Sequence, residues 1–382
     1  MDALTTPLPK AWQKVRLGDI AEIIGGGTPS TQITSFWNGS INWFTPTEIG
    51  ITKYVYKSQR TITPLGLKKS SAKLLPIGTI LLTSRASIGD CAILKVVATT
   101  NQGFQSLIPL EKINNEFLYY LMLTLKNKLL KLASGSTFLE VSPNKIKNLL
   151  IPLPPLNEQI AIANILSGLD HYLYTLDALI LKKESVKKAL SFELLSQRKR
   201  LKGFNQNWQR VRLGDICEIT TGSLDANEMV YYGKYRFYTC AKEYYFIDKY
   251  AFDTEAILIS GNGAYVGYVH YYKGKFNAYQ RTYVLDNFSE HIMFVKYFLT
   301  MFLQSHIQTN KNEGNTPYIV MATLKDFEIL LPPLNEQIAI ANILSDLDSE
   351  IISLKNKKRQ FENIKKALNH DLMSAKIRVL KK

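Results

Sequence analysis

Two stretches of this chain each occur twice, and this internal duplication constrains the fold more than any other feature. The segment Trp12-Gln-Lys-Val-Arg-Leu-Gly-Asp-Ile-Ala-Glu-Ile23 recurs almost unchanged at residues 208–219, and Leu153-Pro-Pro-Leu-Asn-Glu-Gln-Ile-Ala-Ile-Ala-Asn-Ile-Leu-Ser-Gly-Leu-Asp170 recurs at residues 331–348. The two pairs are offset in residue number by 208 − 12 = 196 and by 331 − 153 = 178, so the first intervening stretch is the longer one. We therefore expect one scaffold, present twice, that encloses two different inserts and recognises two different targets.

The composition is that of a globular protein with two or three domains. The chain has 382 residues, of which 46% are hydrophobic and 21% charged. No apolar segment reaches the ~20 residues of a membrane span and no secretory signal is evident, which predicts a cytoplasmic protein without a membrane contact. Cys91, Cys217 and Cys240 stand singly. This spacing indicates neither a disulfide framework nor a zinc site, and we expect no metal centre.

The net charge of +15 is spread unevenly. Residues 14–150 carry 16 Lys/Arg against 7 Asp/Glu (+9), whereas residues 209–330 carry 12 against 13 (−1). The two predicted helical regions are also basic, with 8 against 3 (+5) at 171–202 and 10 against 3 (+7) at 349–382. A concentrated basic surface is compatible with a polyanionic partner and supports that interpretation without establishing it.

Two long amphipathic helices are predicted, from Asn157 to Lys202 and from Asn335 to the C-terminus, because apolar residues recur at steps of three and four. Pro-Pro precedes each helix, and Gly203 follows the first as a stop signal. Each helix would be on the order of 70 Å long and would need a covered apolar stripe to be stable. The obvious cover is the other helix, in a pair that a twofold relation between the two copies would make antiparallel.

The inserts are predicted to be mixed α/β. The expected strands are residues 78–83, 92–97, 256–260 and 265–272, and the expected helices are 115–132 and 289–306. The inserts remain distantly alike: Thr79–Ser84 parallels Ala256–Ser260, Asn101-Gln102 parallels Tyr279-Gln280, and residues 135–137 parallel 314–316. The predicted fold is α+β: two mixed α/β recognition domains (1–152 and 203–330) and two long helical regions (153–202 and 331–382) that form a coiled-coil spacer.

Signatures of several catalytic classes are absent from the sequence. The glycine runs at 25–27 and 261–263 lack the Gly-Lys-Ser/Thr of a phosphate loop. The Pro-Pro pairs are followed by Leu156 and Leu334, not by the aromatic residue of an amino-methyltransferase motif, and no Asp or Glu has Lys two positions later, as metal-dependent nucleases often do. We therefore expect no catalytic residues and no cofactor in this chain, which favours a binding subunit.

The motifs resemble those of one known family, the specificity subunits of type I restriction-modification systems. The resemblance covers nearly the whole chain. It rests on the duplicated Leu-Pro-Pro-Leu-Asn-Glu-Gln-Ile-Ala-Ile-Ala segments, the Arg-Leu-Gly-Asp-Ile openings at 16–20 and 212–216, and Gly26-Gly-Thr-Pro-Ser30. Residues 42–46, 99–104, 261–263 and 279–281 also resemble such recognition domains.

The resemblance implies a non-catalytic DNA-binding subunit that assembles with two adenine-N6 methyltransferase subunits. For cleavage, it implies further assembly with an ATP-driven endonuclease and translocase. S-adenosylmethionine, ATP and Mg²⁺ would then be bound by the partner subunits, with none in this chain. Two different recognition domains on a fixed spacer would read an asymmetric, bipartite site in double-stranded DNA, with unread base pairs between half-sites roughly one helical turn apart.

Base readers are expected among polar residues of the loops, since Arg, Lys, Asn and Gln are the usual readers of base edges. The candidates in the first domain are Thr28, Ser30, Thr31, Gln32, Lys68, Lys69, Arg85, Asn101 and Gln102. The candidates in the second domain are Asn227, Lys242, Asn262, Gln280, Arg281, Asn315 and Tyr318. Any single member of this set could instead be a turn residue or a phosphate contact.

The almost unchanged starts of the two helical regions suggest docking sites for the methyltransferase subunits. The candidates are Leu156, Glu158, Gln159, Leu334, Glu336 and Gln337. The competing interpretation is that these segments are alike only because each packs its helix start against its domain. For the whole chain, the main alternative is a two-headed adaptor that binds proteins through a coiled-coil spacer, which does not explain the basic first insert. A single-chain enzyme is the weaker alternative.

Overall fold

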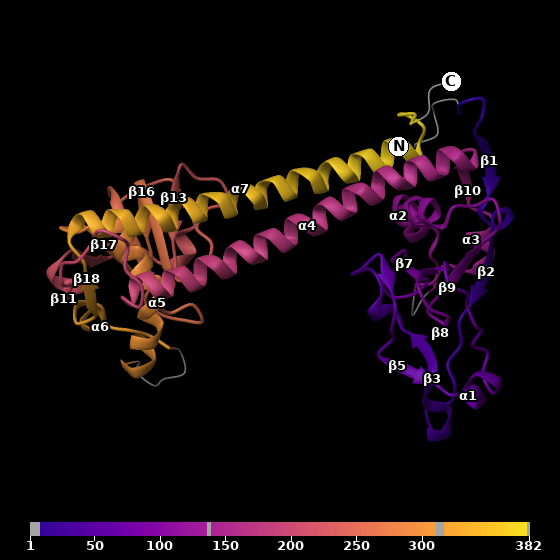
Figure 1. Ribbon diagram of the computed structural model, residues 1–382, viewed down its shortest axis with the longest axis horizontal. Helices are drawn as coiled ribbons and strands as arrows, with labels where there is room; N and C mark the ends of the chain where they lie inside the picture. Colours follow the sequence, from indigo (N-terminus) through magenta and orange to yellow (C-terminus); the bar gives the residue numbers. More distant parts are fainter. Residues whose placement is uncertain (1–7, 136–138, 311–316, 380–382) are drawn as a thin grey trace. The chain divides into compact units, whose positions relative to one another are not determined.

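The computed structural model describes residues 8–135, 139–310 and 317–379. The chain divides into two compact units, the first made of Met1–Leu176 with Lys357–Lys382 and the second of Asp177–Asn356. Each unit holds one insert, one copy of the duplicated frame, and part of each long helix (Figure 1). The predicted boundaries follow the order of the chain, whereas each compact unit takes in segments of both predicted helical regions.

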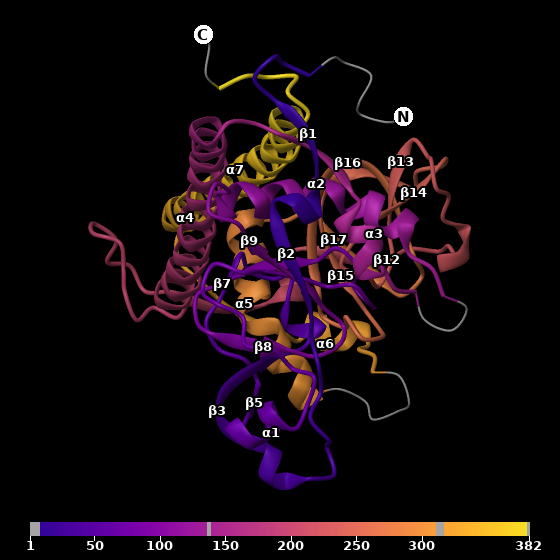
Figure 2. The same cartoon turned by 90° about the vertical axis from the view of Figure 1, so that its right-hand side faces the viewer.

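The first unit contains three sheets. Their orders are β1-β10, β2-β9-β6-β7-β4 and β5-β3-β8. The strands are β1 (Gln13–Arg16), β2 (Ala21–Gly25), β3 (Trp37–Phe44), β4 (Tyr54–Val55), β5 (Arg60–Ile62), β6 (Ile80–Leu82), β7 (Cys91–Leu94), β8 (Ala98–Thr100), β9 (Gln105–Pro109) and β10 (Leu150–Leu153). The helices are α1 (Pro64–Lys68), α2 (Asn115–Leu132) and α3 (Pro143–Lys147), and β3, β5 and α1 lie at the end of the unit away from β1 (Figure 2).

The second unit contains one large sheet of order β12-β17-β15-β16-β13-β14 and the pair β11-β18. The strands are β11 (Gln209–Arg212), β12 (Glu218–Thr221), β13 (Tyr235–Tyr238), β14 (Tyr245–Ile247), β15 (Phe252–Ser260), β16 (Val269–Ala278), β17 (Thr282–Asp286) and β18 (Glu328–Leu331). The helices are α5 (Ile292–Asn310) and α6 (Met321–Lys325). The longest helices, α4 (Leu156–Leu195) and α7 (Leu334–Met373), each contribute to both units.

The duplicated opening and the duplicated helix start pair with each other in both units. β1 runs antiparallel to β10 with Val15 opposite Ile151, and β11 runs antiparallel to β18 with Val211 opposite Ile329. Segments that lie far apart in the chain therefore close the same two-stranded ribbon twice. This ribbon is the constant frame that the sequence duplication predicts.

A buried helix packs against the sheet in each unit. α2 begins after Asn114, whose side chain caps the helix by accepting a hydrogen bond from the Phe117 amide at 2.9 Å. Phe117 and Tyr120 of α2 are fully buried, as are Phe294 and Leu303 of α5 in the second unit. The helices predicted at 115–132 and 289–306 are thus confirmed in type, and the second of them begins at Ile292. Each buried helix lies between its sheet and the long helices, so it connects the recognition domain to the spacer.

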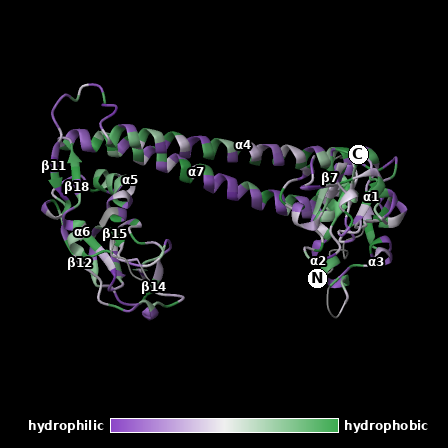
Figure 3. Cartoon of the chain, turned by 90° about the horizontal axis from the view of Figure 1, so that it is seen from below, coloured by the Kyte–Doolittle hydropathy of each residue, from purple (hydrophilic) through white to green (hydrophobic). Residues whose placement is uncertain are grey.

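Within each unit, the segments of α4 and α7 pack antiparallel. In the first unit, the Tyr172 and Phe361 rings lie 4.8 Å apart and Asp170 pairs with Lys365. In the second unit, Lys187 pairs with Asp348, and a Lys183–Glu350 ion pair measures 2.7 Å. Residue numbers rise along α4 as they fall along α7, which confirms the predicted antiparallel pair. Both helices alternate apolar and polar residues along their length (Figure 3).

The long helices end earlier than the sequence predicts. Each has 40 residues, about 60 Å, and they stop at Leu195 and Met373 instead of at residue 202 and at the C-terminus. Just beyond these ends, Gln197 and Ala375 adopt φ values of +62° and +59°, the left-handed conformation that terminates helices. The two residues are equivalent, because their numbers differ by the offset of the duplicated helix starts (375 − 197 = 178). The predicted glycine stop at Gly203 was therefore wrong because a non-glycine residue ends each helix first.

One predicted strand also begins later than expected. Residues 265–268, predicted as the start of a strand, are not in the strand. A turn runs through residues 264–267, and Gly263 and Gly267 both have positive φ. The strand itself, β16, runs from Val269 to Ala278. Among the residues that the structure describes, no helix is long and apolar enough to cross a membrane.

Candidate nucleic-acid interface

In the first unit, the glycine loop after β2 lies directly against the loop after β8. The Gly27 amide donates to the Thr100 carbonyl at 2.8 Å, and the Thr28 hydroxyl donates to the Gln102 side chain. The approach is so close that a Cβ on Gly26 would lie 1.9 Å from the Asn101 carbonyl oxygen. Glycine is required here because only a residue without a side chain allows the two backbones to approach so closely.

A third segment, which continues β6, completes this cluster. The Ser84 amide donates to the Gly103 carbonyl at 2.8 Å, and the Val141 amide donates to the Ser84 carbonyl at 3.1 Å. The next residue, Arg85, forms a 2.8 Å ion pair with Glu140 and stays partly exposed. We call the segments 26–32, 84–85 and 101–103 the first loop cluster. Their backbone hydrogen bonds hold polar side chains from three separate parts of the insert at one end of the sheet.

Two tryptophans and an arginine support the glycine loop, and the sequence analysis did not single them out. The indole nitrogens of Trp37 and Trp43 donate to the carbonyls of Ser30 and Gly27 at 3.0 and 2.9 Å. The Arg60 guanidinium lies 3.7 Å from the Trp37 ring centroid, close enough for a favourable cation–π interaction. Trp37 and Trp43 lie close together in the sequence, and this was the only sequence signal for their role. Two nearby aromatic residues are equally typical of an ordinary core.

The second unit builds an equivalent cluster from its own insert. The Gly261 amide donates to the Arg281 carbonyl at 2.8 Å, and the Ile319 amide donates to the Gly261 carbonyl at 2.9 Å. A Cβ on Gly222 would lie 1.8 Å from the Ala278 carbonyl oxygen. Residues 222–224, 261–262, 279–281 and 318 therefore converge, and we call them the second loop cluster.

The two clusters share two backbone hydrogen bonds and the pair Gln102 and Gln280, but most of their other side chains differ. Ser84, Gly103 and Val141 bond one another as Gly261, Arg281 and Ile319 do. The numbers of these counterparts differ by nearly the same amount as those of the duplicated helix starts (261 − 84 = 177, 281 − 103 = 178 and 319 − 141 = 178). The predicted parallels of Thr79–Ser84 with Ala256–Ser260 and of Asn101-Gln102 with Tyr279-Gln280 are thereby confirmed. The third parallel, between residues 135–137 and 314–316, falls largely outside the described residues. A constant backbone thus displays different polar groups in the two units.

The structure places the predicted site residues as follows. Thr28, Ser30, Thr31, Gln32, Asn101 and Gln102 lie in the first loop cluster with Arg85. Lys68 and Lys69 are exposed at the end of α1. Asn262, Gln280, Arg281 and Tyr318 lie in the second loop cluster, and Asn262 forms a β-bridge with Tyr318. Lys242 is exposed, with its ammonium 5.3 Å from the Tyr265 ring centroid. Asn227 is exposed on a short 3-10 helix at Ala226–Glu228. Asn315 lies outside the described residues. That these residues read bases stays a prediction.

The chemistry of both clusters is that of binding. They offer hydroxyl, amide and guanidinium groups, which are the donors and acceptors that read base edges and phosphates. Among the described residues, no group of three or more His, Cys, Asp or Glu side chains could hold a metal ion. The polar loops at one end of each sheet therefore form a candidate nucleic-acid interface in each unit.

The helix-start glutamates, predicted as docking contacts, are internal to the fold. Glu336 is fully buried and accepts hydrogen bonds from Arg200 Nη2 at 2.6 Å and from Trp208 Nε1 at 3.2 Å. Glu158 is buried in the same way, with Arg378 Nε at 2.6 Å and Trp12 Nε1 at 3.0 Å. Each carboxylate ties the opening of its own domain to a residue just past the end of a long helix.

The adjacent glutamines are equally occupied. Gln159 donates to the Pro154 carbonyl at 3.0 Å and accepts from the Asn114 amide at 3.0 Å, and Gln337 bonds the Pro332 carbonyl and the His291 amide at 2.8 and 3.0 Å. These four side chains hold the frame together, so a direct contact with a partner chain would have to displace them. The duplication at these positions has a structural cause of its own.

The exposed face of each helix start carries two apolar side chains beside an asparagine, Asn157 or Asn335, and its residues are identical in the two units. Leu156 and Ile160 of α4 are each 41% exposed, and Leu334 and Ile338 of α7 are 52% and 38% exposed. Of the predicted docking residues, only Leu156 and Leu334 are therefore open to a partner. Ile160 and Ile338 were not among the predicted docking residues, and they are exposed one helical turn after Leu156 and Leu334.

Two recognition domains of one kind on a duplicated frame define a class of two-site binding proteins, and comparison with known proteins identifies the family. The model of the type I restriction modification DNA specificity domain matches residues 9–183 and again residues 205–363. The chain belongs to this family and carries two copies of its domain. The second match repeats the first in the order that the internal duplication predicts.

Individual relatives are similar over part or nearly all of the chain. The type I restriction enzyme MjaIX specificity subunit of Methanocaldococcus jannaschii is 30% identical over 414 aligned positions, which cover 97% of this chain and 95% of that protein. The EcoDI specificity subunit of Escherichia coli is 37% identical over 171 positions, 44% of this chain and 37% of that protein. Among solved structures, the type I restriction-modification S subunit from M. genitalium matches with a TM-score of 0.63 and 18% identity, covering 97% of this chain and 98% of that one. The HsdS subunit of Thermoanaerobacter tengcongensis matches with a TM-score of 0.56 and 19% identity, covering 99% of this chain and 100% of that one.

Proposed function

We propose that this chain selects the DNA target of a type I restriction-modification complex by reading an asymmetric, bipartite sequence. The observation that carries the proposal is the pair of equivalent loop clusters, which share two backbone hydrogen bonds and differ in most of the side chains that they present. Each cluster would read one half-site. Since the side chains differ, the two half-sites would differ in sequence, with base pairs between them that neither cluster contacts.

Base recognition would take place mainly in the major groove, where every base pair presents a distinct pattern of donors and acceptors. Gln102 and Gln280 occupy equivalent positions in the two clusters and are exposed, and Arg281 follows Gln280. Glutamine amides pair bidentately with adenine and arginine with guanine. The remaining hydroxyl and ammonium groups would bind the phosphate backbone and fix the register.

We infer that methylation and cleavage belong to partner subunits: two adenine methyltransferases and, for cleavage, an ATP-driven endonuclease. S-adenosylmethionine, ATP and Mg²⁺ would be bound by those partners, since the sequence contains no motif for them. The match to specificity subunits and the family's DNA specificity domain support assembly with other subunits. A complex that acts on chromosomal DNA would be located in the cytoplasm. The comparisons do not favour the adaptor alternative.

Mapping N6-methyladenine across a host genome tests the proposed function directly. The chain would be co-expressed with the methyltransferase of its own system, and the genome read by single-molecule sequencing. We expect one motif made of two different half-sites with a constant number of unread base pairs between them. A stable complex that yields a single continuous motif, or no motif, would contradict the proposal.

The first domain should account for more of the salt dependence of DNA binding than the second. Removing one phosphate contact lowers the slope of log K against log salt concentration by about 0.9. We expect Lys68→Gln with Lys69→Gln to reduce the slope by about two such steps, whereas Lys242→Gln should reduce it by one at most. Affinities of the intact complex for its target at several salt concentrations give both slopes. Equal reductions from the two domains would contradict a basic first domain that makes the larger phosphate contribution.

The exposed apolar helix starts should bind the methyltransferase subunits. We expect Leu156→Asp with Ile160→Asp to weaken strongly the binding of the methyltransferase subunit that docks at the start of α4, because a charge would be buried in an apolar contact. The matched change at Leu334 and Ile338 should act on the other. Native mass spectrometry of the co-expressed complex would show one methyltransferase per chain in place of two. The control is Ile51→Asp, at a side chain that is 84% exposed and belongs to neither helix start, which should leave two bound. Full occupancy in all variants would rule out docking at these surfaces.

A further inference from the structure

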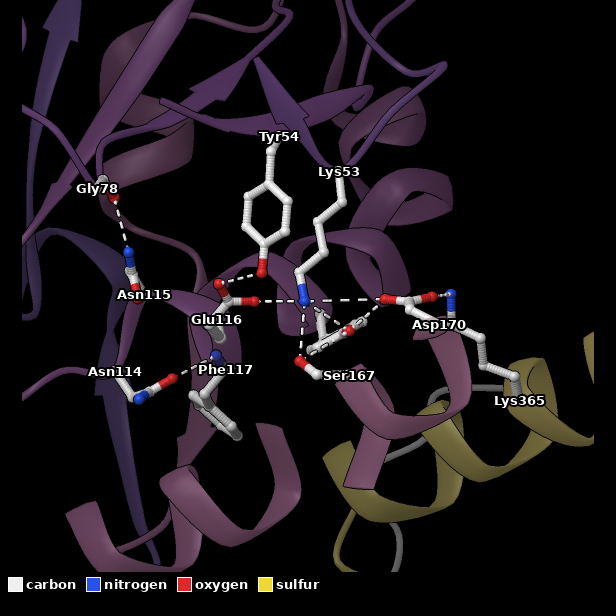
Figure 4. A network of polar contacts seen from close by, with 11 residues as sticks. Lys53, Tyr54, Gly78, Asn114, Asn115, Glu116, Phe117, Ser167, Asp170 and Lys365 are labelled. Atoms are coloured by element: carbon white, nitrogen blue, oxygen red, sulfur yellow. Dashed lines mark hydrogen bonds and ion pairs between the residues drawn. The ribbon is translucent and has the colours of Figure 1, made fainter. Parts of the chain in front are cut away.

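A polar cluster joins the recognition domain to both long helices in the first unit (Figure 4). The Tyr120 hydroxyl on α2 donates to one oxygen of Asp170 on α4, and Lys365 on α7 pairs with the other oxygen. Ser167, one turn earlier on α4, lies 3.3 Å from the same hydroxyl. Three helices, of which one belongs to the insert and two to the spacer, therefore meet at a single carboxylate. We call this group the first joint.

The second unit contains the same arrangement with the two long helices exchanged. The Tyr297 hydroxyl on α5 donates to Asp348 on α7 at 2.7 Å, with Ser345 at 3.2 Å, and Lys187 on α4 pairs with the other oxygen of Asp348. Ser, Asp and Lys match their counterparts at the offset of the duplicated helix starts (345 − 167, 348 − 170 and 365 − 187 all equal 178), and the tyrosines match within one position (297 − 120 = 177). This group is the second joint.

Both joints have the directional character that apolar packing lacks. The surrounding core of aliphatic and aromatic side chains holds α2 and α5 against the long helices through the hydrophobic effect, which is non-directional. A hydroxyl that donates to one oxygen of a carboxylate, whose other oxygen is held by an ammonium group, has few alternative positions. Burial raises the pKa of Tyr120 and of Tyr297, so both remain protonated donors at neutral pH.

We infer that Asp170 and Asp348 are positioning residues that fix the number of base pairs between the two half-sites. The inference rests on the proposed function, because spacing matters only if each domain reads its own half-site. Each joint sets the orientation of one recognition domain on its segment of the helix pair. Since successive base pairs are about 3.4 Å apart along the duplex, a small change in that orientation is enough to bring a neighbouring register within reach.

The two joints differ in strength, which makes the inference more specific. In the first joint, Lys53 from the insert donates to Tyr120 at 2.8 Å and to Ser167 at 2.9 Å, and it also pairs with Glu116 of α2. In the second joint, the additional cation is Lys296 of α5 itself, 3.9 Å from Asp348. The first joint therefore includes a contact from the β4 edge of its domain, and the loss of a single hydrogen bond should matter more in the second joint.

The experiment compares the distribution of spacer lengths among methylated sites in the full complex. The variants are Tyr120→Phe and Asp170→Asn in the first joint, and Tyr297→Phe and Asp348→Asn in the second. We expect the half-site sequences to remain unchanged while the share of methylated sites with one base pair more or fewer rises several-fold over the wild-type share. The increase should be larger for Tyr297→Phe than for Tyr120→Phe.

Two controls separate orientation from general loss of stability. Tyr119→Phe removes a neighbouring buried phenol hydroxyl for which the described residues show no hydrogen bond, and Ile257→Val loosens the core of the second domain with its joint intact. Neither should broaden the spacing, and melting curves would show how far each variant is destabilised. A constant spacing in all four joint variants, with a wild type that methylates a bipartite motif, would overturn the inference. A wild type without a bipartite motif would instead refute the proposed function.

Discussion

Replacing Glu336 with alanine should destabilise the second unit by about 2–4 kcal/mol, because Arg200 and Trp208 would lose the acceptor that their half-buried donors share. For a unit of this size, we expect a fall in melting temperature of roughly 5–10 °C. The side chain is fully buried, so no water can replace the carboxylate without entering the frame. Calorimetry of the intact chain, followed as the transition of the second unit, measures the effect.

Glu350→Ala is the matched control for this prediction. It removes the same side chain from the same helix, but Glu350 is 45% exposed in its ion pair with Lys183. Exposed ion pairs contribute at most about 1 kcal/mol, so this variant should melt close to the wild type. Equal destabilisation by the two substitutions would show that the buried carboxylate does not hold the frame.

A methyl group on Gly26 should strongly weaken recognition of the first half-site. The added Cβ would lie 1.9 Å from the Asn101 carbonyl and 2.4 Å from Thr100 Oγ1, so the two loops would have to separate. Asn101 and Gln102 would be displaced from any base they contact, and removing one base contact costs about 1–3 kcal/mol. We therefore expect target affinity to fall by roughly tenfold to a hundredfold or more for Gly26→Ala, as measured by equilibrium binding of the assembled complex. Gly222→Ala should do the same for the second half-site.

Gly168→Ala tests whether this weakening comes from the close approach and not from alanine itself. Gly168 lies within α4, and a Cβ there would meet nothing within 4 Å. Alanine stabilises a helix by up to about 1 kcal/mol relative to glycine, so binding should be unchanged and stability equal or higher. Wild-type affinity in Gly26→Ala would mean that the first loop cluster does not contact DNA.

The organisation of the fold could be predicted because it is encoded in repeated and periodic patterns. The duplicated segments predict two copies of a frame, and the three- and four-residue spacing of apolar residues predicts α4 and α7. The helix ends could not be predicted, since Gln197 and Ala375 take up left-handed conformations that their residue types do not favour. The partner of Glu158 could not be predicted either, because Arg378 lies near the other end of the chain and becomes its neighbour only when the long helices pair.

The sequence predicted which loops form the candidate site, but it did not predict the side-chain contacts that hold these loops and domains in place. Asn101-Gln102 and Gln280-Arg281 were found because Asn, Gln and Arg are usual readers of base edges and lie here in polar loops, where binding residues are common. The joints were missed, although Ser167 and Asp170 lie in a duplicated segment and Lys187 and Lys365 share the offset of that segment. Because Lys187 and Lys365 are related by the same offset of 178 as the duplicated helix starts, a comparison of the two repeats could have pointed to this pair. The tyrosines that complete the joints lie in the divergent inserts, where alignment of the two copies is weak.

The most direct test of the account compares the methylation motifs specified by Gln102→Ala and Gln280→Ala in otherwise identical complexes. If each loop cluster reads one half-site, Gln102→Ala should relax base preference in one half of the motif only, and Gln280→Ala in the other half only, with the spacing unchanged in both. Relaxation of the same half by both substitutions, or of both halves by either one, would contradict two independent recognition domains on a duplicated frame.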